Sequence, residues 1–297
     1  MPSATSGRCG AVPNFSRPPG TDASHGKKYE IKMAAFLFAR ALHKTEDFQL
    51  ASNVRGFGVF DDLVFRYRLR DTEVWKTCFV QLKHKRDGGN IQLSSLLEMS
   101  GDFSLFKYFE SYCLIKSKPS TDDNMKHCGS FNDFKFVIYT SGRMGINSVL
   151  QVNRSESLSI LSSGKDCITF DEAADPEIFT FFKELSEYHK FLVDLDKLFA
   201  RGTFGDTEIV QKIQNFQDTI TNKAILDRLK NLKSGWRKGC LTGLIKELAK
   251  CDFNLYKVFL SKVKIFHSQS SEISLKGLTE RELNVACKVS LSVAKSI

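Results

Sequence analysis

FDDLVF, residues 60–65, and FVQLKHK, residues 79–85, are two short apolar runs that carry polar or charged residues where a buried strand would not. Their aromatic and β-branched content and their length predict two β-strands. The polar segment between them contains LRDTE, which is typical of a hairpin turn, so we expect the strands to pair antiparallel. Because side chains alternate between the faces of a strand, Gln81 and Lys83 share one face, and the pairing brings Asp62 to it.

This combination of side chains has a definite chemistry. An acid, an amide oxygen and an ammonium group at neighbouring strand ends can hold a hydrated divalent cation and orient a water molecule. A lysine in a buried strand needs a partner, and Asp62 is the partner that the sequence offers to Lys83. The alternative is an exposed strand end with a basic fringe formed by Lys83, Lys85 and Arg86. Asp61 faces away from Asp62 in a regular strand, which leaves it a supporting part.

The pattern resembles the active-site signature of the restriction-endonuclease-like, or PD-(D/E)XK, nuclease superfamily. That signature has an acid at the start of one strand and an acid-any-lysine tripeptide on the next. Asp62 (or Asp61) matches the first acid and Gln81-Leu82-Lys83 matches the tripeptide, with Gln in place of the acid as in a Mrr-like branch. The resemblance covers residues 26–142 and is closest to the domains of antiphage-type double-stranded DNA endonucleases and to the N-terminal domains of large arthropod proteins.

The resemblance implies a metal-dependent endonuclease that hydrolyses phosphodiester bonds of DNA, with Mg²⁺ (or Mn²⁺) as its cofactor. Asp62 would be the principal metal ligand, Gln81 would offer a neutral oxygen, and Lys83 would orient or deprotonate the water and steady the phosphate. Glu30 matches a carboxylate that a preceding helix adds to the metal site in related nucleases. The alternative for Glu30 is an acid in the first turn of a helix, where the helix dipole favours it.

The same resemblance implies DNA rather than RNA as the partner, self-association as a homodimer, and compatibility with the effector module of a defence-type protein. Because Gln81 stands where the signature has an acid, a second function is open. In this alternative the chain is a catalytically inactive nuclease-fold domain that binds nucleic acid or a protein partner.

The order of predicted elements agrees with this resemblance. We expect a helix over residues 26–44, a strand over 48–52, the two strands already described, a helix over 91–115 that Gly101-Asp102 can divide, and a strand over 134–140. Helix, three strands, helix and strand is the order of the superfamily core. It predicts an α/β (α+β) fold with a mixed sheet over residues 26–175.

The second half of the chain has a different character. Two short apolar pieces, residues 149–152 and 167–170, are candidates for strands at the edge of the sheet, and residues 259–266 can end in a strand. After Pro176 the apolar residues recur at helical spacing, over 177–200, 209–232, 241–260 and 279–294. We therefore expect a helical region over 176–297 that packs on the core or forms its own lobe.

A basic stretch lies within this helical region. Its members are Lys212, Lys223, Arg228, Lys230, Lys233, Arg237 and Lys238. It is either a phosphate-binding face or a solvated helix surface.

Composition narrows the class of protein. The 297 residues carry a net charge of +9, which favours a polyanionic partner or serves solubility. The eight cysteines contain no Cys-x-x-Cys spacing, so we expect reduced core thiols rather than a zinc ribbon. No signal peptide or spanning segment is evident, which predicts an intracellular protein, cytoplasmic or nuclear, without a membrane partner.

Residues 1–25 hold four of the six prolines and few large apolar side chains, which predicts a disordered tail. The chain has no phosphate-binding loop of the Walker type, no Gly-x-Ser-x-Gly and no His-Glu-x-x-His. The lack of a sensing or motor module suggests a fragment of a longer protein.

Overall fold

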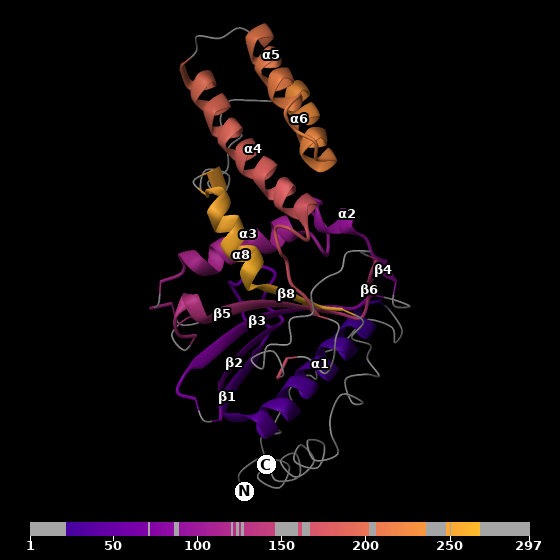
Figure 1. Cartoon of the computed structure of the whole chain (residues 1–297), viewed down its shortest axis with the longest axis vertical. Helices are drawn as coiled ribbons and strands as arrows, with labels where there is room; N and C mark the ends of the chain where they lie inside the picture. Colours follow the sequence, from indigo (N-terminus) through magenta and orange to yellow (C-terminus); the bar gives the residue numbers. More distant parts are fainter. Residues whose placement is uncertain are drawn as a thin grey trace, which may run out of the picture.

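The structure is a computed structural model of a mixed α/β protein, with helices on both faces of a six-stranded sheet (Figure 1). It describes residues 22–70, 72–85, 89–119, 121–122, 125, 128–145, 160–161, 167–201, 206–235, 248–249 and 251–267.

The main sheet combines an antiparallel half with a parallel half. Its strands, in spatial order, are β1 (Thr45–Ser52), β2 (Leu63–Leu69), β3 (Trp75–Lys83), β5 (Phe134–Thr140), β8 (Val263–Phe266) and β7 (Cys167–Ile168). β1, β2 and β3 form an antiparallel meander, so the predicted hairpin between β2 and β3 is confirmed. β5 and β8 run parallel to β3, and β7 closes the edge antiparallel to β8.

Seven α-helices lie within the described ranges. They are α1 (Asp22–Lys44), α2 (Leu93–Leu96), α3 (Leu105–Ser117), α4 (Pro176–Arg201), α5 (Asp206–Gln217), α6 (Lys223–Gly235) and α8 (Phe253–Lys262). Figure 1 shows α1 on one face of the sheet, α3 and α8 on the other, and α4 to α6 extending away from it. Within these ranges, no helix combines the length and the apolar composition that crossing a bilayer requires.

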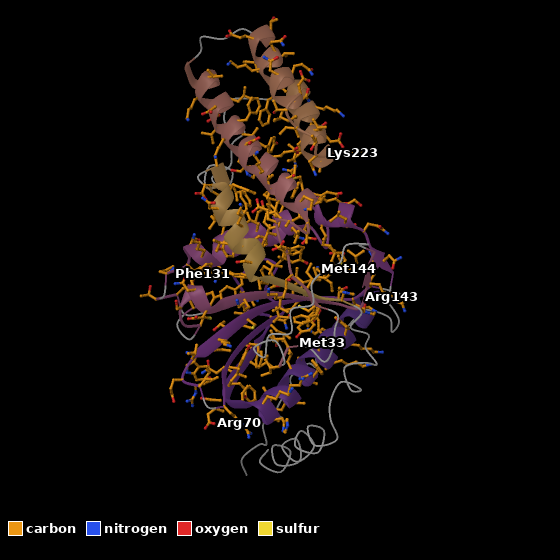
Figure 2. All side chains as sticks on the ribbon, in the orientation of Figure 1. Met33, Arg70, Phe131, Arg143, Met144 and Lys223 are labelled. Atoms are coloured by element: carbon orange, nitrogen blue, oxygen red, sulfur yellow. The ribbon has the colours of Figure 1, made fainter. Side chains whose placement is uncertain are left out.

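Both faces of the central strands are buried, which explains their nearly continuous apolar runs. One core lies between the sheet and α1 and includes Phe65, Val80 and Tyr139. The other lies between the sheet and α3 and is dominated by aromatic rings, with Phe79 stacked on Phe136 at 5.5 Å between ring centroids. Side chains fill both layers (Figure 2).

The predicted order of helix, three strands, helix and strand is confirmed by α1, β1, β2, β3, α3 and β5. The strand over 134–140 has the predicted bounds. The segment from residue 91 differs, because it begins with β4 (Asn90–Ile91), which pairs with β6 (Arg143–Met144), and continues as the short α2.

The break expected at Gly101-Asp102 is present and separates α2 from α3. Gly101 has a φ of +121°, which glycine adopts without strain. Ser104 then caps α3, because its hydroxyl accepts a hydrogen bond from the Lys107 N–H at 3.2 Å.

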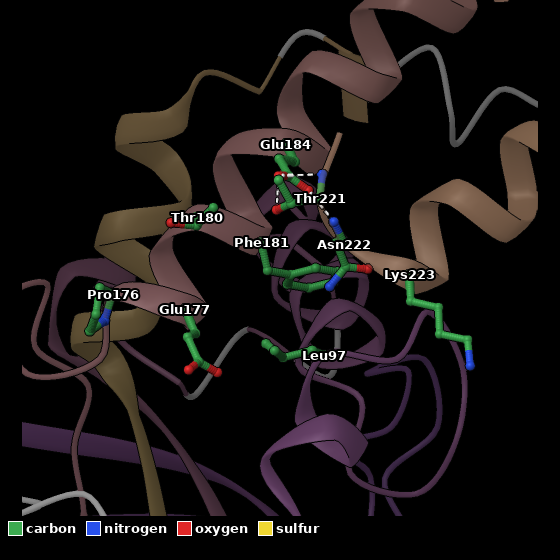
Figure 3. Close-up of a pocket in the computed structure, with 9 residues that line it drawn as sticks. All are labelled: Leu97, Pro176, Glu177, Thr180, Phe181, Glu184, Thr221, Asn222 and Lys223. Carbon is green, nitrogen blue, oxygen red and sulfur yellow. Dashed lines mark hydrogen bonds between the residues drawn. The ribbon is translucent and has the colours of Figure 1, made fainter. Parts of the chain in front are cut away.

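The single helix predicted over 209–232 is wrong, because the chain turns between α5 and α6. Asn222 ends that turn, and its Oδ1 accepts hydrogen bonds from the N–H groups of Ala224 (2.9 Å) and Ile225 (3.2 Å). Glu184 of α4 holds the turn from outside, since its carboxylate accepts from the N–H groups of Thr221 (2.9 Å) and Asn222 (2.8 Å) (Figure 3). Side-chain capping therefore overrides the helical spacing.

The two halves of the chain share one sheet and one core. β8 lies between β5 and β7, so the region after residue 176 contributes a strand to the main sheet. Tyr256 of α8 stacks on Phe109 of α3 at 4.1 Å between centroids and also contacts Phe182 of α4. The helical region therefore packs on the core at these residues.

Other expectations have mixed outcomes. The edge strand expected at 167–170 is present as β7, and the helix expected over 177–200 is α4. α8 corresponds to the last part of the helix expected over 241–260, and the strand at its end is β8. Leu248 and Ala249 are also helical, and residues 241–247 and 250 lie outside the described residues. α1 begins inside the segment expected to be a tail. Residues 1–21, the strand expected at 149–152 and the helix expected at 279–294 lie outside the described residues.

Candidate active site

Asp62 and Gln81 meet across the pair β2–β3, as their register requires. Leu63 is opposite Val80, so Asp62, one residue before β2, is opposite Gln81. The Gln81 Nε2 donates a hydrogen bond to Asp62 Oδ2, and the Leu82 N–H donates to the same oxygen at 2.7 Å. Asp62 is therefore tied to β3 by a side chain and by the backbone.

The loop before β2 fixes the backbone of this acid. The Asn53 N–H donates to the carbonyl of Asp62 at 3.0 Å, and the Val54 N–H donates to the carbonyl of Asp61 at 2.9 Å. Phe57 and Phe60 anchor the same loop, because both rings are fully buried in the core beneath α3. The position of Asp62 thus follows from packing as well as from its own hydrogen bonds.

Lys83 ends β3 on the same face, but its ion-pair partner differs from the predicted one. The Lys83 Nζ lies 3.2 Å from Oδ1 of Asp102, so the expectation that Asp62 would pair with it is wrong. Asp102 lies in the break between α2 and α3, and the Tyr108 hydroxyl donates to its backbone carbonyl at 2.7 Å. Lys83 still acts on Asp62, because its positive charge lowers the pKa of that carboxyl.

Sequence reasoning noted Asp102 only as part of a helix break. The sequence did contain a signal, because Asp102 follows a glycine and lies two residues before the cap of a helix. At such a position the backbone is not helical, so the side chain can reach a neighbouring strand. The pairing itself joins residues 19 apart and depends on how α3 lies over the sheet.

Glu30 comes from α1, at the same end of β3. The Tyr29 ring lies 5.5 Å from the ring of His84, which brings the start of α1 to the end of β3. The Glu30 carboxylate forms an ion pair with Lys27 at 2.7 Å, and its side chain is 31% exposed. Its negative charge raises the pKa of Asp62.

The environment of Asp62 raises its pKa to about 6. Burial is the main cause, and the hydrogen bond from the Leu82 N–H opposes it. The negative charges of Glu30 and Asp61 raise the pKa further, and Lys83 lowers it. A bound cation would stabilise this arrangement, in which two acids lie near one largely buried carboxylate.

The oxygen donors of Asp62 and Glu30 suit Mg²⁺ if water supplies most of its ligands. Mg²⁺ prefers oxygen ligands, keeps several waters and usually takes only one or two carboxylates from the protein. Asp62 and Glu30 supply two carboxylates, whereas no group of three His, Cys, Asp or Glu side chains suited to a metal occurs in the described part of the chain. These residues therefore fit a water-rich magnesium site rather than a cage built by the protein alone.

Gln81 has a part that was not expected of it. A carboxylate only accepts hydrogen bonds, so the amide nitrogen of Gln81 has to face Asp62, and its oxygen lies on the other branch. In this arrangement Gln81 orients Asp62. Its predicted contribution of an oxygen to the metal stays a prediction.

A pocket lies elsewhere, between α4 and the start of α6 (Figure 3). It is lined by Leu97, Pro176, Glu177, Thr180, Phe181, Glu184, Thr221, Asn222 and Lys223. Its buried acid, Glu184, is already hydrogen-bonded within the turn that it stabilises. The candidate active site is separate from this pocket.

The sequence matches no known protein family and no curated protein, and the structure matches no solved structure. The class of this protein is therefore argued from the residues at the ends of β2 and β3.

Proposed function

We propose that this protein is a metal-dependent endonuclease of the restriction-endonuclease-like type, which hydrolyses phosphodiester bonds of DNA. One observation carries the proposal: Asp62, Gln81 and Lys83 converge on one face at the common end of β2 and β3. The order of α1, β1 to β3, α3 and β5 supports it, because the same order led to the resemblance. The net charge of +9 suits a polyanionic substrate.

Asp62 and Glu30 would hold the metal in this proposal. Bound there, Mg²⁺ would polarise the phosphate and supply a reactive water at neutral pH. The chain keeps Asp62 in place through the Leu82 N–H and the Gln81 amide, so the carboxylate presents its other oxygen without reorganisation.

Lys83 would place positive charge beside the phosphate oxygens and orient the attacking water. Asp102 holds the Lys83 ammonium group in position, and the Tyr108 hydroxyl fixes the backbone of Asp102. Hydrolysis adds the water oxygen to phosphorus, breaks the bond from phosphorus to one sugar oxygen, and passes a proton to that oxygen. The Lys83 side chain is 25% exposed, which leaves it accessible to a substrate.

A second function is favoured by Gln81. An amide that donates to Asp62 leaves the tripeptide without its usual acid, so the domain would bind nucleic acid or a protein partner without cutting. Salt-dependent DNA affinity without cleavage would select DNA binding, and no affinity for DNA would select a protein partner.

Cleavage of supercoiled plasmid DNA tests the proposal. We expect nicking with Mg²⁺ and none with EDTA, and a loss of about 100-fold or more in Asp62→Asn and Lys83→Gln. Asp194→Asn and Lys197→Gln are matched controls, because these residues form an exposed ion pair on α4 at 2.9 Å. Cleavage by the wild type that survives both site substitutions would overturn the proposal, as would no cleavage at all. An RNA substrate in parallel distinguishes the two nucleic acids.

A further inference from the structure

Three lysines form a line across neighbouring strands, on the face of the sheet that carries α1. Lys76 lies in β3, Lys135 in β5 and Lys264 in β8. Cys78 is opposite Lys135, and Val137 is opposite Lys264, so each lysine is diagonal to the next. Diagonal neighbours in a sheet are about 7–8 Å apart, which is within reach of long side chains.

The line is separate from the candidate active site. Cys78 and Val80 lie two and four residues after Lys76, and Val137 lies two after Lys135, so they share a face with these lysines. They belong to the core beneath α1, whereas Asp62, Gln81 and Lys83 lie on the α3 side. Lys76 is near the start of β3 and Lys83 is its last residue. The two groups therefore lie at opposite ends of β3, and the strand residues of the candidate active site lie on the other face from the lysines.

None of the three lysines forms an ion pair within the part of the chain that the structure describes, although all three are half-buried. Burial lowers the pKa of Lys264, and the charge of Lys135 lowers it further, against an opposing effect of Cys167. Burial raises the pKa of Cys78, while the charges of Lys135 and Lys76 lower it. The three ammonium groups therefore share one local field. Asp133 precedes β5 in the 3₁₀-helix Phe131–Asp133.

Like charges at neighbouring strand positions are destabilising unless an anion lies between them. We propose that Lys76, Lys135 and Lys264 form a binding site for the phosphate groups of a nucleic-acid backbone, outside the candidate active site. A line across three strands suits successive phosphates, because each ammonium group can contact a different one.

An anionic membrane fits this line less well. Basic membrane-binding surfaces pair their charges with exposed apolar side chains that enter the lipid. The large apolar side chains exposed in the described residues are Ile31, Val74, Leu114, Val210 and Val258. None lies within β3, β5 or β8, and Val74, which directly precedes β3, is the one next to the line in sequence.

The test measures DNA affinity in EDTA by fluorescence anisotropy at increasing NaCl concentrations. Binding without metal is independent of cleavage, so this proposal rests on the proposed function only for the choice of DNA as the probe. Failure of cleavage and failure of this site are thereby distinguishable.

The test variant is Lys76→Gln/Lys135→Gln/Lys264→Gln, and the matched control is Lys212→Gln/Lys223→Gln/Lys230→Gln. The control removes the same charge from exposed positions of the basic stretch on α5 and α6. We expect the slope of log affinity against log salt concentration to shrink by about 2.7 in the test variant, since each lost phosphate contact removes about 0.9. We expect the control to keep the slope of the wild type.

Equal slopes in the wild type and the test variant would overturn the proposal, as would a loss confined to the control, which would assign binding to the basic stretch. If the triple variant fails to fold, the single variants Lys76→Gln and Lys135→Gln decide, with an expected loss of about 0.9 each. Binding of inorganic phosphate and of vesicles of an anionic phospholipid is measured in parallel. Binding to either that needs the three lysines, with DNA affinity unchanged, would also overturn the proposal.

Discussion

In the proposed function, the chemistry depends on Asp62, and its pKa near 6 predicts a pH dependence. A metal ligand has to be ionised, so we expect cleavage to rise with pH through about 6 and to level off above it. Glu30 raises that pKa through its negative charge. Glu30→Gln should therefore move the acid limb of the profile to lower pH.

The same shift is measurable without activity. A carboxyl ¹³C titration of Asp62 by NMR should report a pKa near 6 in the wild type and a lower value in Glu30→Gln. Lys197→Gln serves as the control, because it removes a charge on α4. An unchanged Asp62 titration in Glu30→Gln would show that the two carboxylates do not share a site.

Gln81 permits a second prediction at the scale of one residue. Gln81→Glu replaces a donor to Asp62 with a second carboxylate, so the pair becomes repulsive. In EDTA we expect the free energy of unfolding to fall by about 1–3 kcal/mol. Added Mg²⁺ should recover more stability in this variant than in the wild type, since a cation binds the additional acid. Thermal melting with and without Mg²⁺ measures both effects, and equal Mg²⁺ responses would contradict the account.

The elements with strong local signals were predictable from sequence. β5 has the predicted bounds because FKFVIYT is a β-branched and aromatic run between polar segments. The turn between α5 and α6 was missed because it depends on Glu184, which is 37 residues before Thr221 and accepts from its N–H. Helical spacing continues on both sides of such a turn, so a local pattern does not reveal it.

This turn gives a prediction at the scale of elements. Glu184→Ala removes the carboxylate that accepts hydrogen bonds from the Thr221 and Asn222 N–H groups, just before α6 begins. We expect a loss of about 2–3 kcal/mol in the free energy of unfolding, measured by urea denaturation. Glu187→Ala is the control, because Glu187 is an exposed acid on the same helix. Equal effects of the two substitutions would remove the capping role from Glu184.

At the scale of the whole molecule, the sheet joins distant parts of the chain. β8 lies beside β5, although more than 120 residues separate Phe136 from its partner Val263. A strand pattern carries no information about such a partner, so the topology of the second half could not be predicted. The convergence of Asp62, Gln81 and Lys83 was predictable, because β2 and β3 are joined by a short hairpin. The contact of Asp102 with Lys83 was not predictable, because it depends on how α3 packs over the sheet.

His189 tests how firmly the helical region packs on this core. Its ring lies 5.6 Å from that of Phe106, and its Nδ1 lies 3.4 Å from the Tyr256 hydroxyl. Burial, and then the charge of Arg228, lowers its pKa from 6.5 to about 4. The unfolded chain therefore binds a proton more readily, and stability should fall by about 3 kcal/mol as the pH drops from 6.5 to 4.

Urea denaturation of the wild type and of His189→Gln at pH 7 and pH 4.5 measures this contribution. Asp62 acts in the opposite direction, since its raised pKa favours the folded state below about 6, and it is present in both proteins. The difference between the two proteins therefore isolates His189. We expect the substitution to weaken the pH dependence, and identical pH dependences would mean that His189 is protonated equally in the folded and unfolded states.

The central claim is that Asp62 and Glu30 hold a divalent cation beside Lys83. The most direct test is anomalous scattering from a crystal of this protein soaked in Mn²⁺. The account predicts a peak at coordination distance from both the Asp62 and the Glu30 carboxylates, close to the distance of about 2.0–2.1 Å at which Mg²⁺ binds oxygen ligands. A soaked crystal with no peak between these two side chains would contradict it.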